Sequence, residues 1–170
     1  MSAKIIDGKE IAAEIRQEIA SEVIELKASI GVIPGLAVVL VGEDPASQIY
    51  VRNKQKAATE AGMLATDHKL PSDVSTQTLR LKIEELNADQ AVHGILVQLP
   101  LPDHLDEKEF IHRIAPEKDV DGLHPVSMGL LLAGTPRFVP ATPAGVQQML
   151  LRTGNSPSGK HIVICGRSDI

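Results

Sequence analysis

The chain has few aromatic residues and a single cysteine. Only 2% of its 170 residues are aromatic, with one tyrosine, Tyr50, two phenylalanines and no tryptophan. The only cysteine, Cys165, has no partner within the chain, which excludes an intramolecular disulfide and a cysteine-rich metal cage. Because Cys165 stands in an apolar run, we expect it to be a buried core thiol.

Long apolar runs and an excess of basic charge are also missing. No apolar stretch approaches the roughly 20 residues of a membrane-spanning helix, and residues 1–8 lack the pattern of a signal peptide. The formal net charge of −5, with both signs mixed along the chain, leaves no basic stripe for a nucleic-acid backbone. We therefore expect a cytoplasmic globular protein without membrane or nucleic-acid partners.

The sequence does contain a regular alternation of helix and strand patterns. Residues 7–30 place an apolar side chain every three or four positions, which predicts an amphipathic helix. Residues 35–42 and 92–99 are β-branched and leucine runs typical of strands buried on both sheet faces. The same reasoning adds helices at 45–62, 75–87 and 142–153, a short segment at 66–70 and a buried strand at 160–166. This alternation predicts an α/β fold with a parallel sheet and right-handed crossovers.

Two stretches are rich in turn-forming residues. Residues 100–143 contain many Pro, Gly, His and Asp residues with only short helical patterns, and such loops at strand ends are where sites usually lie. Residues 154–159 (GNSPSG) have the composition of a linker. The linker predicts a boundary between a domain at 1–153 and a second one that starts within 154–170.

One face of the helix expected at 45–62 carries chemically useful groups. Ser47, Tyr50, Val51 and Lys54 follow one another at i, i+3, i+4 and i+7, so a phenol and an amine project together. On spacing alone, a partly buried ring beside a solvated charge is the more common arrangement. The spacing therefore suggests a site without establishing one.

Polar side chains also follow the second predicted strand. Gln98 stands at the carboxyl end of that strand, where parallel sheets bind ligands, although it could equally tie down a loop backbone. Asp119 and Asp121 could ligate a hard cation, but no EF-hand loop surrounds them and the histidines lack zinc-site spacing. A carboxylate that accepts two hydrogen bonds from an amine-bearing heterocycle is the better use of one aspartate, and we predict no metal site.

Four segments, taken in order, resemble the signature blocks of the methylenetetrahydrofolate dehydrogenase/cyclohydrolase family. They are residues 45–62 (PASQIYVRNKQKAATEAG), 94–102 (GILVQLPLP), 118–124 (KDVDGLH) and 138–145 (FVPATPAG). Residues 159–170 (GKHIVICGRSDI) resemble the first strand and turn of that family's dinucleotide domain. The resemblance implies a parallel-sheet, folate-binding catalytic domain at 1–153, followed at 154–170 by the first strand of a truncated Rossmann-like domain.

The resemblance also implies roles for individual residues. Lys54 corresponds to the catalytic lysine, and Tyr50 to the ring that stacks on the folate. Gln98 would hydrogen-bond and orient Lys54 and help to set its protonation state. Asp121 would accept hydrogen bonds from the amino-pyrimidine part of the pterin, while Gly166, Arg167 and Ser168 would approach the 2′-phosphate of NADP.

The chemistry implied by the family has two steps in one-carbon metabolism and purine biosynthesis. Hydride passes from 5,10-methylenetetrahydrofolate to NADP, and water then opens the methenyl product to 10-formyltetrahydrofolate. The family resemblance also points to a homodimer. Because these 170 residues include only the start of the dinucleotide domain and no GxGxxG motif, we expect little or no dehydrogenase activity from them alone.

Two other functions remain as alternatives. One is a non-catalytic folate-binding or oligomerisation module, which turnover of methenyltetrahydrofolate would reject. The other is an enzyme related to amino-acid dehydrogenases, which share an α/β substrate domain and a catalytic lysine but lack the block from Tyr50 to Lys54.

Overall fold

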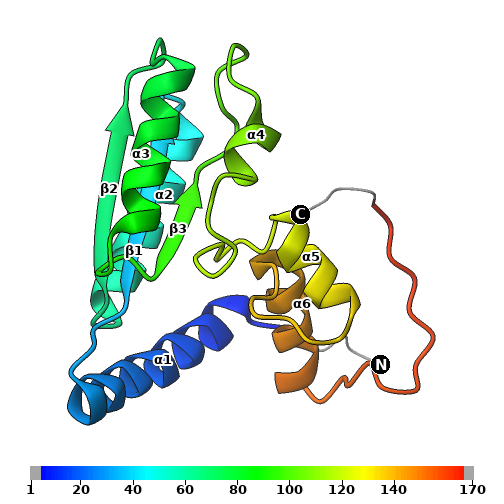
Figure 1. Ribbon diagram of the computed structural model, residues 1–170. Coiled ribbons are helices and arrows are strands. Elements are labelled where there is room, and N and C mark those ends of the chain that lie inside the picture. Colours follow the sequence, from blue (N-terminus) through cyan, green and yellow to red (C-terminus); the bar gives the residue numbers. More distant parts are fainter. Residues whose placement is uncertain (1–4, 167–170) are drawn as a thin grey trace.

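A three-stranded parallel sheet lies at the centre of the computed structural model, which describes residues 5–166 (Figure 1). The strands are β1 (Gly35–Val41), β2 (Leu64–Leu70) and β3 (Gly94–Val97), in the order β2-β1-β3. Gly35 of β1 pairs with Leu64 of β2, and Leu36 of β1 pairs with Gly94 of β3. The predicted α/β class with a parallel sheet is confirmed, although β3 is shorter than the predicted strand at 92–99.

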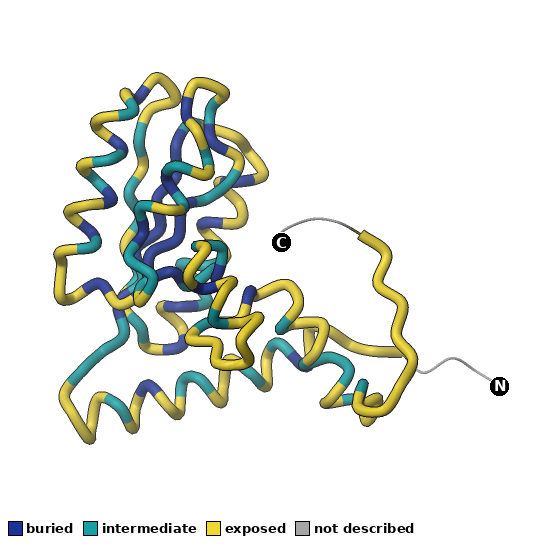
Figure 2. The backbone as a smooth tube through the Cα atoms, turned by 45° about the vertical axis from the view of Figure 1, so that its right-hand side comes forward, coloured by how far each residue is buried: buried dark blue, intermediate teal, exposed yellow. Residues whose placement is uncertain are grey.

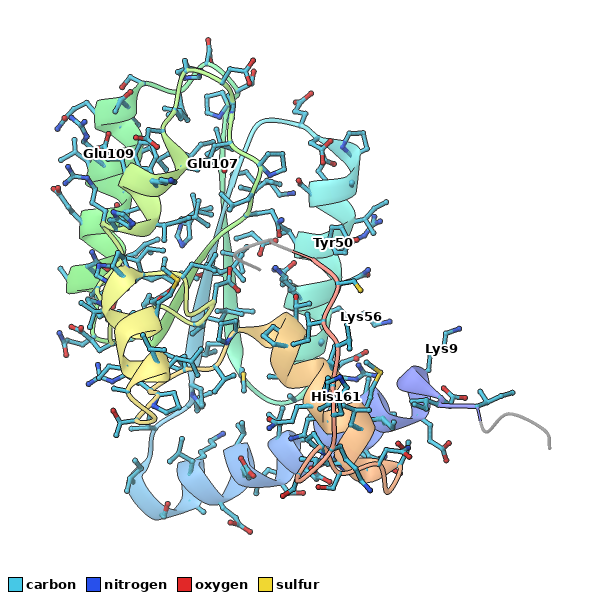
Figure 3. All side chains as sticks on the ribbon, turned by 90° about the vertical axis from the view of Figure 1, so that its right-hand side faces the viewer. Lys9, Tyr50, Lys56, Glu107, Glu109 and His161 are labelled. Carbon is cyan, nitrogen blue, oxygen red and sulfur yellow. The ribbon has the colours of Figure 1, made fainter. Side chains whose placement is uncertain are left out.

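Helices cover both faces of the sheet. Figure 1 and Figure 3 show α3 (Thr76–Ala88) on one face and α2 (Pro45–Glu60) on the other. Alternate residues of β1 point to the two sides, so Val39 packs in the cluster with α3, and Val38 packs with Val51 of α2. Full burial of one such aliphatic side chain stabilises the folded state by about 1.5–3 kcal/mol. The middle strand is therefore buried on both faces, as its unbroken apolar run predicts.

The larger of the two core clusters extends beyond α3. It includes Phe110 of the short helix α4 (Glu107–Ile111), which has no exposed surface. On the solvent side, the guanidinium of Arg80 on α3 forms a two-bond ion pair with Glu109 of α4. These contacts hold the loop after β3 against the sheet.

Helix α1 (Gly8–Ile30) begins and ends where the sequence predicts. The carboxylate of Asp7 accepts hydrogen bonds from the first backbone N–H groups, and Gly31 ends the helix in the left-handed conformation. Figure 1 shows α1 running beneath the sheet toward α6 (Ala141–Arg152). Arg152 donates two hydrogen bonds to the Glu18 carboxylate, at 2.8 and 2.6 Å, and so joins the two helices.

The last helices are less buried than the sheet. Helix α5 (Pro125–Leu132) follows the loop after β3, and α6 has no buried residue. Helix α6 begins at Ala141, one residue before the predicted start at 142, and Pro140 immediately precedes it. Within the described residues, no helix is long and apolar enough to cross a membrane.

The strand predicted at 160–166 does not form. Residues 161–166 have no regular secondary structure and are exposed, and Figure 2 shows this stretch as a continuous exposed segment. The predicted burial of Cys165 is wrong for the same reason, since its side chain is exposed. A strand needs a neighbour to pair with, and no part of the described chain pairs with this segment.

Candidate active site

A cleft of about 1180 Å³ opens on the face of the sheet that carries α2. Its walls come from α2, from the carboxyl end of β3 and from the segment of residues 118–124, and Ala141 and Thr142 at the start of α6 add to them. Its lining is mainly apolar, with a few polar side chains, which is typical of a small-molecule site. Tyr50, Lys54, Gln98 and Asp121, which the sequence singles out, all line this cleft.

Lys54 and Gln98 are joined by a hydrogen bond. The Lys54 ammonium donates to the Gln98 side-chain oxygen at 3.2 Å, across 44 residues of sequence. Gln98 itself is fixed twice, because its backbone N–H donates to the Val39 carbonyl and its side-chain NH₂ donates to the Leu99 carbonyl. The carboxamide is therefore held with its oxygen toward the lysine, and the predicted contact between the two residues is confirmed.

Helix α2 presents Tyr50 beside a buried stripe. Asp44 caps the helix by accepting a hydrogen bond from the Ser47 N–H at 2.7 Å. Ser47 and Val51 are buried against the sheet, whereas Tyr50 is 61% exposed (Figure 3). The ring thus lies at the cleft wall with much of its surface free, which is what a stacking platform requires.

Asp121 is half-buried and electrostatically coupled to the lysine. Burial raises the pKa of its carboxyl above the ordinary range, the Lys54 charge opposes this rise, and the Asp119 charge adds to it. A ligand that donates hydrogen bonds to such a half-buried carboxyl group stabilises its charged form. The structure thus brings Asp121 into the same cleft as Lys54, although the two residues are far apart in sequence.

Asp119 does not face this cleft as a partner of Asp121. It is 1% exposed, and its carboxylate accepts hydrogen bonds from the backbone N–H groups of Leu123 and His124. Within residues 5–166, no group of three or more His, Cys, Asp or Glu side chains is arranged to hold a metal ion.

The residues expected to contact NADP are only partly described. Arg167 and Ser168 lie outside the described residues. Gly166 ends an exposed segment, and nothing packs within 4 Å of the position that a Cβ would take. The described part of the chain therefore offers no formed cradle for the cofactor.

The cleft also contains residues for which the sequence predicted no role. Phe138 and Thr142 line it from the loop and helix that precede residue 153. His93 lines it from the start of β3, with its Nδ1 accepting a hydrogen bond from the Gly35 N–H at 3.0 Å. No spacing rule links these residues to Lys54, because only the tertiary fold brings them to one wall.

The chain is similar to known proteins along its whole length. Residues 6–121 match the model of the tetrahydrofolate dehydrogenase/cyclohydrolase catalytic domain. The chain belongs to this family. It is 54% identical over 170 residues to the bifunctional protein FolD of Geobacillus thermodenitrificans and 55% identical to that of Moorella thermoacetica. Both alignments cover 100% of this chain and 60% of the relative, so the chain spans about three fifths of the relatives' length.

Solved structures show the same relationship. The bifunctional FolD enzyme of Campylobacter jejuni superposes with a TM-score of 0.95 at 41% identity, covering 99% of this chain and 60% of that one. The Trypanosoma brucei enzyme, solved with NADP and an inhibitor, gives a TM-score of 0.94 at 39% identity, covering 100% and 59%. The family resemblance inferred from the four sequence blocks is confirmed.

Proposed function

We propose that this chain forms the folate-binding catalytic part of a bifunctional methylenetetrahydrofolate dehydrogenase/cyclohydrolase. The observation that carries the proposal is the hydrogen bond between Lys54 and Gln98, in a cleft that Tyr50 and Asp121 also line. Relatives named bifunctional FolD support the same assignment. The substrate is then 5,10-methylenetetrahydrofolate, and the product of the second step is 10-formyltetrahydrofolate, which supplies one-carbon units to purine biosynthesis.

In this proposal Lys54 moves protons. During hydrolysis, water adds to the methenyl carbon, and the carbon–nitrogen bond to one ring nitrogen breaks. The Lys54 amine accepts a proton from the water and returns one to the departing nitrogen. The Gln98 oxygen accepts a hydrogen bond from the lysine and so holds its nitrogen at one point in the cleft.

Tyr50 and Asp121 bind and orient the folate. The exposed Tyr50 ring offers a flat face on which the folate rings stack. The Asp121 carboxylate offers two acceptor oxygens to the amino-pyrimidine edge of the pterin. With one group on the ring face and one on its edge, the reactive carbon is held beside Lys54.

NADP, when bound, accepts the hydride of the first step. Gly166, Arg167 and Ser168 are proposed to approach its 2′-phosphate, for which the fork of donors on an arginine is suited. The described segment up to Gly166 is exposed, so this part of the proposal rests on the family alone. A homodimer in the cytoplasm is proposed on the same ground.

The direct test uses the natural protein that contains these residues. Its intact mass is measured, and the same sample is assayed for hydrolysis of 5,10-methenyltetrahydrofolate and for NADP-dependent oxidation of 5,10-methylenetetrahydrofolate. Both activities are expected from a protein with the length of its relatives. A protein of that length with neither activity would contradict the proposal.

A further inference from the structure

The segment of residues 118–124, which carries Asp121, is fastened at its first residue. The Lys118 ammonium donates hydrogen bonds to three backbone carbonyls at the end of α3, those of Leu86, Asn87 and Asp89, at 3.1, 2.8 and 2.7 Å. The Lys118 carbonyl accepts a hydrogen bond from the Ile95 N–H of β3 at 2.8 Å. The start of the segment is therefore fixed to both the helix and the sheet.

A buried carboxylate closes the rest of the segment. One oxygen of Asp119 accepts a hydrogen bond from the His124 N–H at 2.9 Å, and the other lies 3.4 Å from the Leu123 nitrogen. The Asp119 carbonyl also accepts from the Gly122 N–H at 3.2 Å. Because Asp119 is 1% exposed, these backbone donors take the place of water around its charge. These hydrogen bonds join residue 119 to residues 122–124 and so form a turn that contains Asp121.

The turn also fits against the start of α6. Gly122 has a φ of 69°, in the left-handed region that favours glycine, and a Cβ at this position would lie 3.2 Å from the Pro140 ring. The backbone at Asp121 and Gly122 therefore has little freedom while the Asp119 bonds remain.

We propose that Asp119 is a positioning residue, whose buried carboxylate sets the turn that holds Asp121 in the cleft. It acts on the ligand only through Asp121 and does not touch it. The inference rests on the proposed function, because Asp121 is taken to bind the folate. It adds a role for the first aspartate of the KDVDG stretch, for which the sequence suggested only a possible cation ligand.

A double-mutant cycle tests this role. Tetrahydrofolate, kept anaerobic, is titrated calorimetrically into the unmodified protein and into Asp119→Asn, Asp121→Ala and the double variant. Asp119→Asn is expected to weaken affinity about tenfold, because a hydrogen bond to a charged acceptor is lost from the turn. In the Asp121→Ala background, Asp119→Asn should have almost no further effect. An equal loss in both backgrounds overturns the positioning role.

Asn87→Ala is the matched control. The Asn87 side chain also makes two hydrogen bonds to backbone groups, those of Arg113 and Ala115. The alanine variant removes only these two bonds and keeps the Asn87 backbone carbonyl that Lys118 contacts. It should lower the urea midpoint of unfolding and leave the tetrahydrofolate affinity unchanged within about twofold. If Asn87→Ala weakens binding as much as Asp119→Asn does, the effect is general loss of stability, and the proposal fails.

Hydrogen exchange separates this inference from the proposed function. In the unmodified protein, the amides of Leu123 and His124 should exchange slowly, and they should lose that protection in Asp119→Asn but keep it in Asn87→Ala. If Asp119→Asn does not fold, Asp119→Ser replaces it. If tetrahydrofolate does not bind the unmodified protein, the proposed function fails, yet the exchange result still decides whether Asp119 sets the turn. Rapid exchange of both amides in the unmodified protein overturns the inference.

Discussion

The central sheet and the last part of the described chain use similar residues with opposite results. Strand β1 (GLAVVLV) is buried along almost its whole length. Residues 161–165 (HIVIC) are nearly as apolar, yet Ile162, Val163 and Ile164 are 51%, 72% and 87% exposed. Helix α6 likewise has no buried residue, although Val146 and Leu151 lie on it.

The difference lies in the neighbours rather than in the residues. Strand β1 has a paired strand on each side and a helix over each face, so every apolar side chain meets another. The 161–165 stretch has no such partner within the described chain. Burial of apolar surface stabilises a strand only when other elements supply the rest of the interface. The well-packed region supplies the walls of the candidate active site at α2 and β3, whereas Ala141 and Thr142 come from α6.

The largest expected effect is on chemistry within the well-packed region. Lys54→Met should lower the rate of methenyltetrahydrofolate hydrolysis by about 10²- to 10⁴-fold, because an apolar side chain cannot transfer a proton. The matched control is Lys56→Met on the same helix, since the exposed Lys56 side chain forms an ion pair with Glu60 and is not among the residues that line the cleft. Figure 3 labels Lys56 and Tyr50 on this helix. Initial rates are measured with the natural protein that contains these residues. Near-normal hydrolysis by Lys54→Met would remove the lysine from the mechanism.

The second effect compares stability in the two regions directly. Phe110→Ala should lower the free energy of unfolding by about 3–5 kcal/mol, because it leaves a cavity in the core cluster between the sheet and α3. Leu151→Ala on α6 should change it by no more than about 0.5 kcal/mol, because Leu151 is 45% exposed. Urea unfolding followed by circular dichroism gives both values. Similar losses for the two variants would mean that α6 is packed as tightly as the sheet.

The third prediction separates the proposed folate contact at Asp121 from the proposed cofactor contacts at residues 166–168. Asp121→Ala should weaken tetrahydrofolate binding by about tenfold or more, because the pterin amino groups lose their charged acceptor. NADP affinity should change little, since the family resemblance assigns the cofactor contacts to residues 166–168 and not to Asp121. Calorimetric titration of each ligand into the natural protein gives the two ratios. Equal losses for both ligands would indicate a folding defect instead.

The smallest effect is a pH dependence that comes from Asp121. Burial raises the pKa of its carboxyl in the native state, whereas an aspartate in the unfolded state has a pKa of about 3.9. At pH values between these two, the native state therefore keeps a proton that the unfolded state has released. Stability from this group is therefore fully present below pH 3.9 and is lost as pH rises through the raised native pKa. Relative to Asp121→Asn, the unmodified protein should become less stable as pH rises above about 4.

Paired urea unfolding curves across that pH range check the prediction. The Asn variant keeps the size of the side chain and has no proton to lose. A stability difference that does not depend on pH, or one that favours the unmodified protein as pH rises, would mean that burial does not control the protonation of Asp121.

Local sequence patterns predict much of the fold, because they depend on neighbours a few residues away. The period of α1, the punctuation of α2 and the apolar run of β1 all identify their elements correctly. The hydrogen bond from Lys54 to Gln98 is different, since 44 residues separate the two and no periodicity links them. The residue patterns place Lys54 on a helix face and Gln98 at the end of a strand, but they do not predict that the two meet. The family resemblance predicts that contact.

The predictions that are wrong or incomplete share one cause, which is that a local sequence pattern does not specify contacts with other parts of the fold. The strand at 160–166 and the burial of Cys165 were inferred from an apolar run alone, and pairing depends on partners that such a run does not specify. For Asp119 the sequence suggests only a role as a cation ligand, because a second aspartate, Asp121, stands two residues away. Its partners are two backbone N–H groups, and side-chain identities do not reveal such bonds.

The most direct test of the proposed folate-binding cleft is a titration of the natural protein that contains these residues with tetrahydrofolate, followed by backbone amide NMR. The account predicts saturable one-to-one binding, with the largest shifts at Tyr50, Lys54, Gln98 and Asp121 and small shifts in α5 and outside the cleft. Absence of binding, or shifts concentrated away from these four residues, would contradict the proposal that folate binds in this cleft.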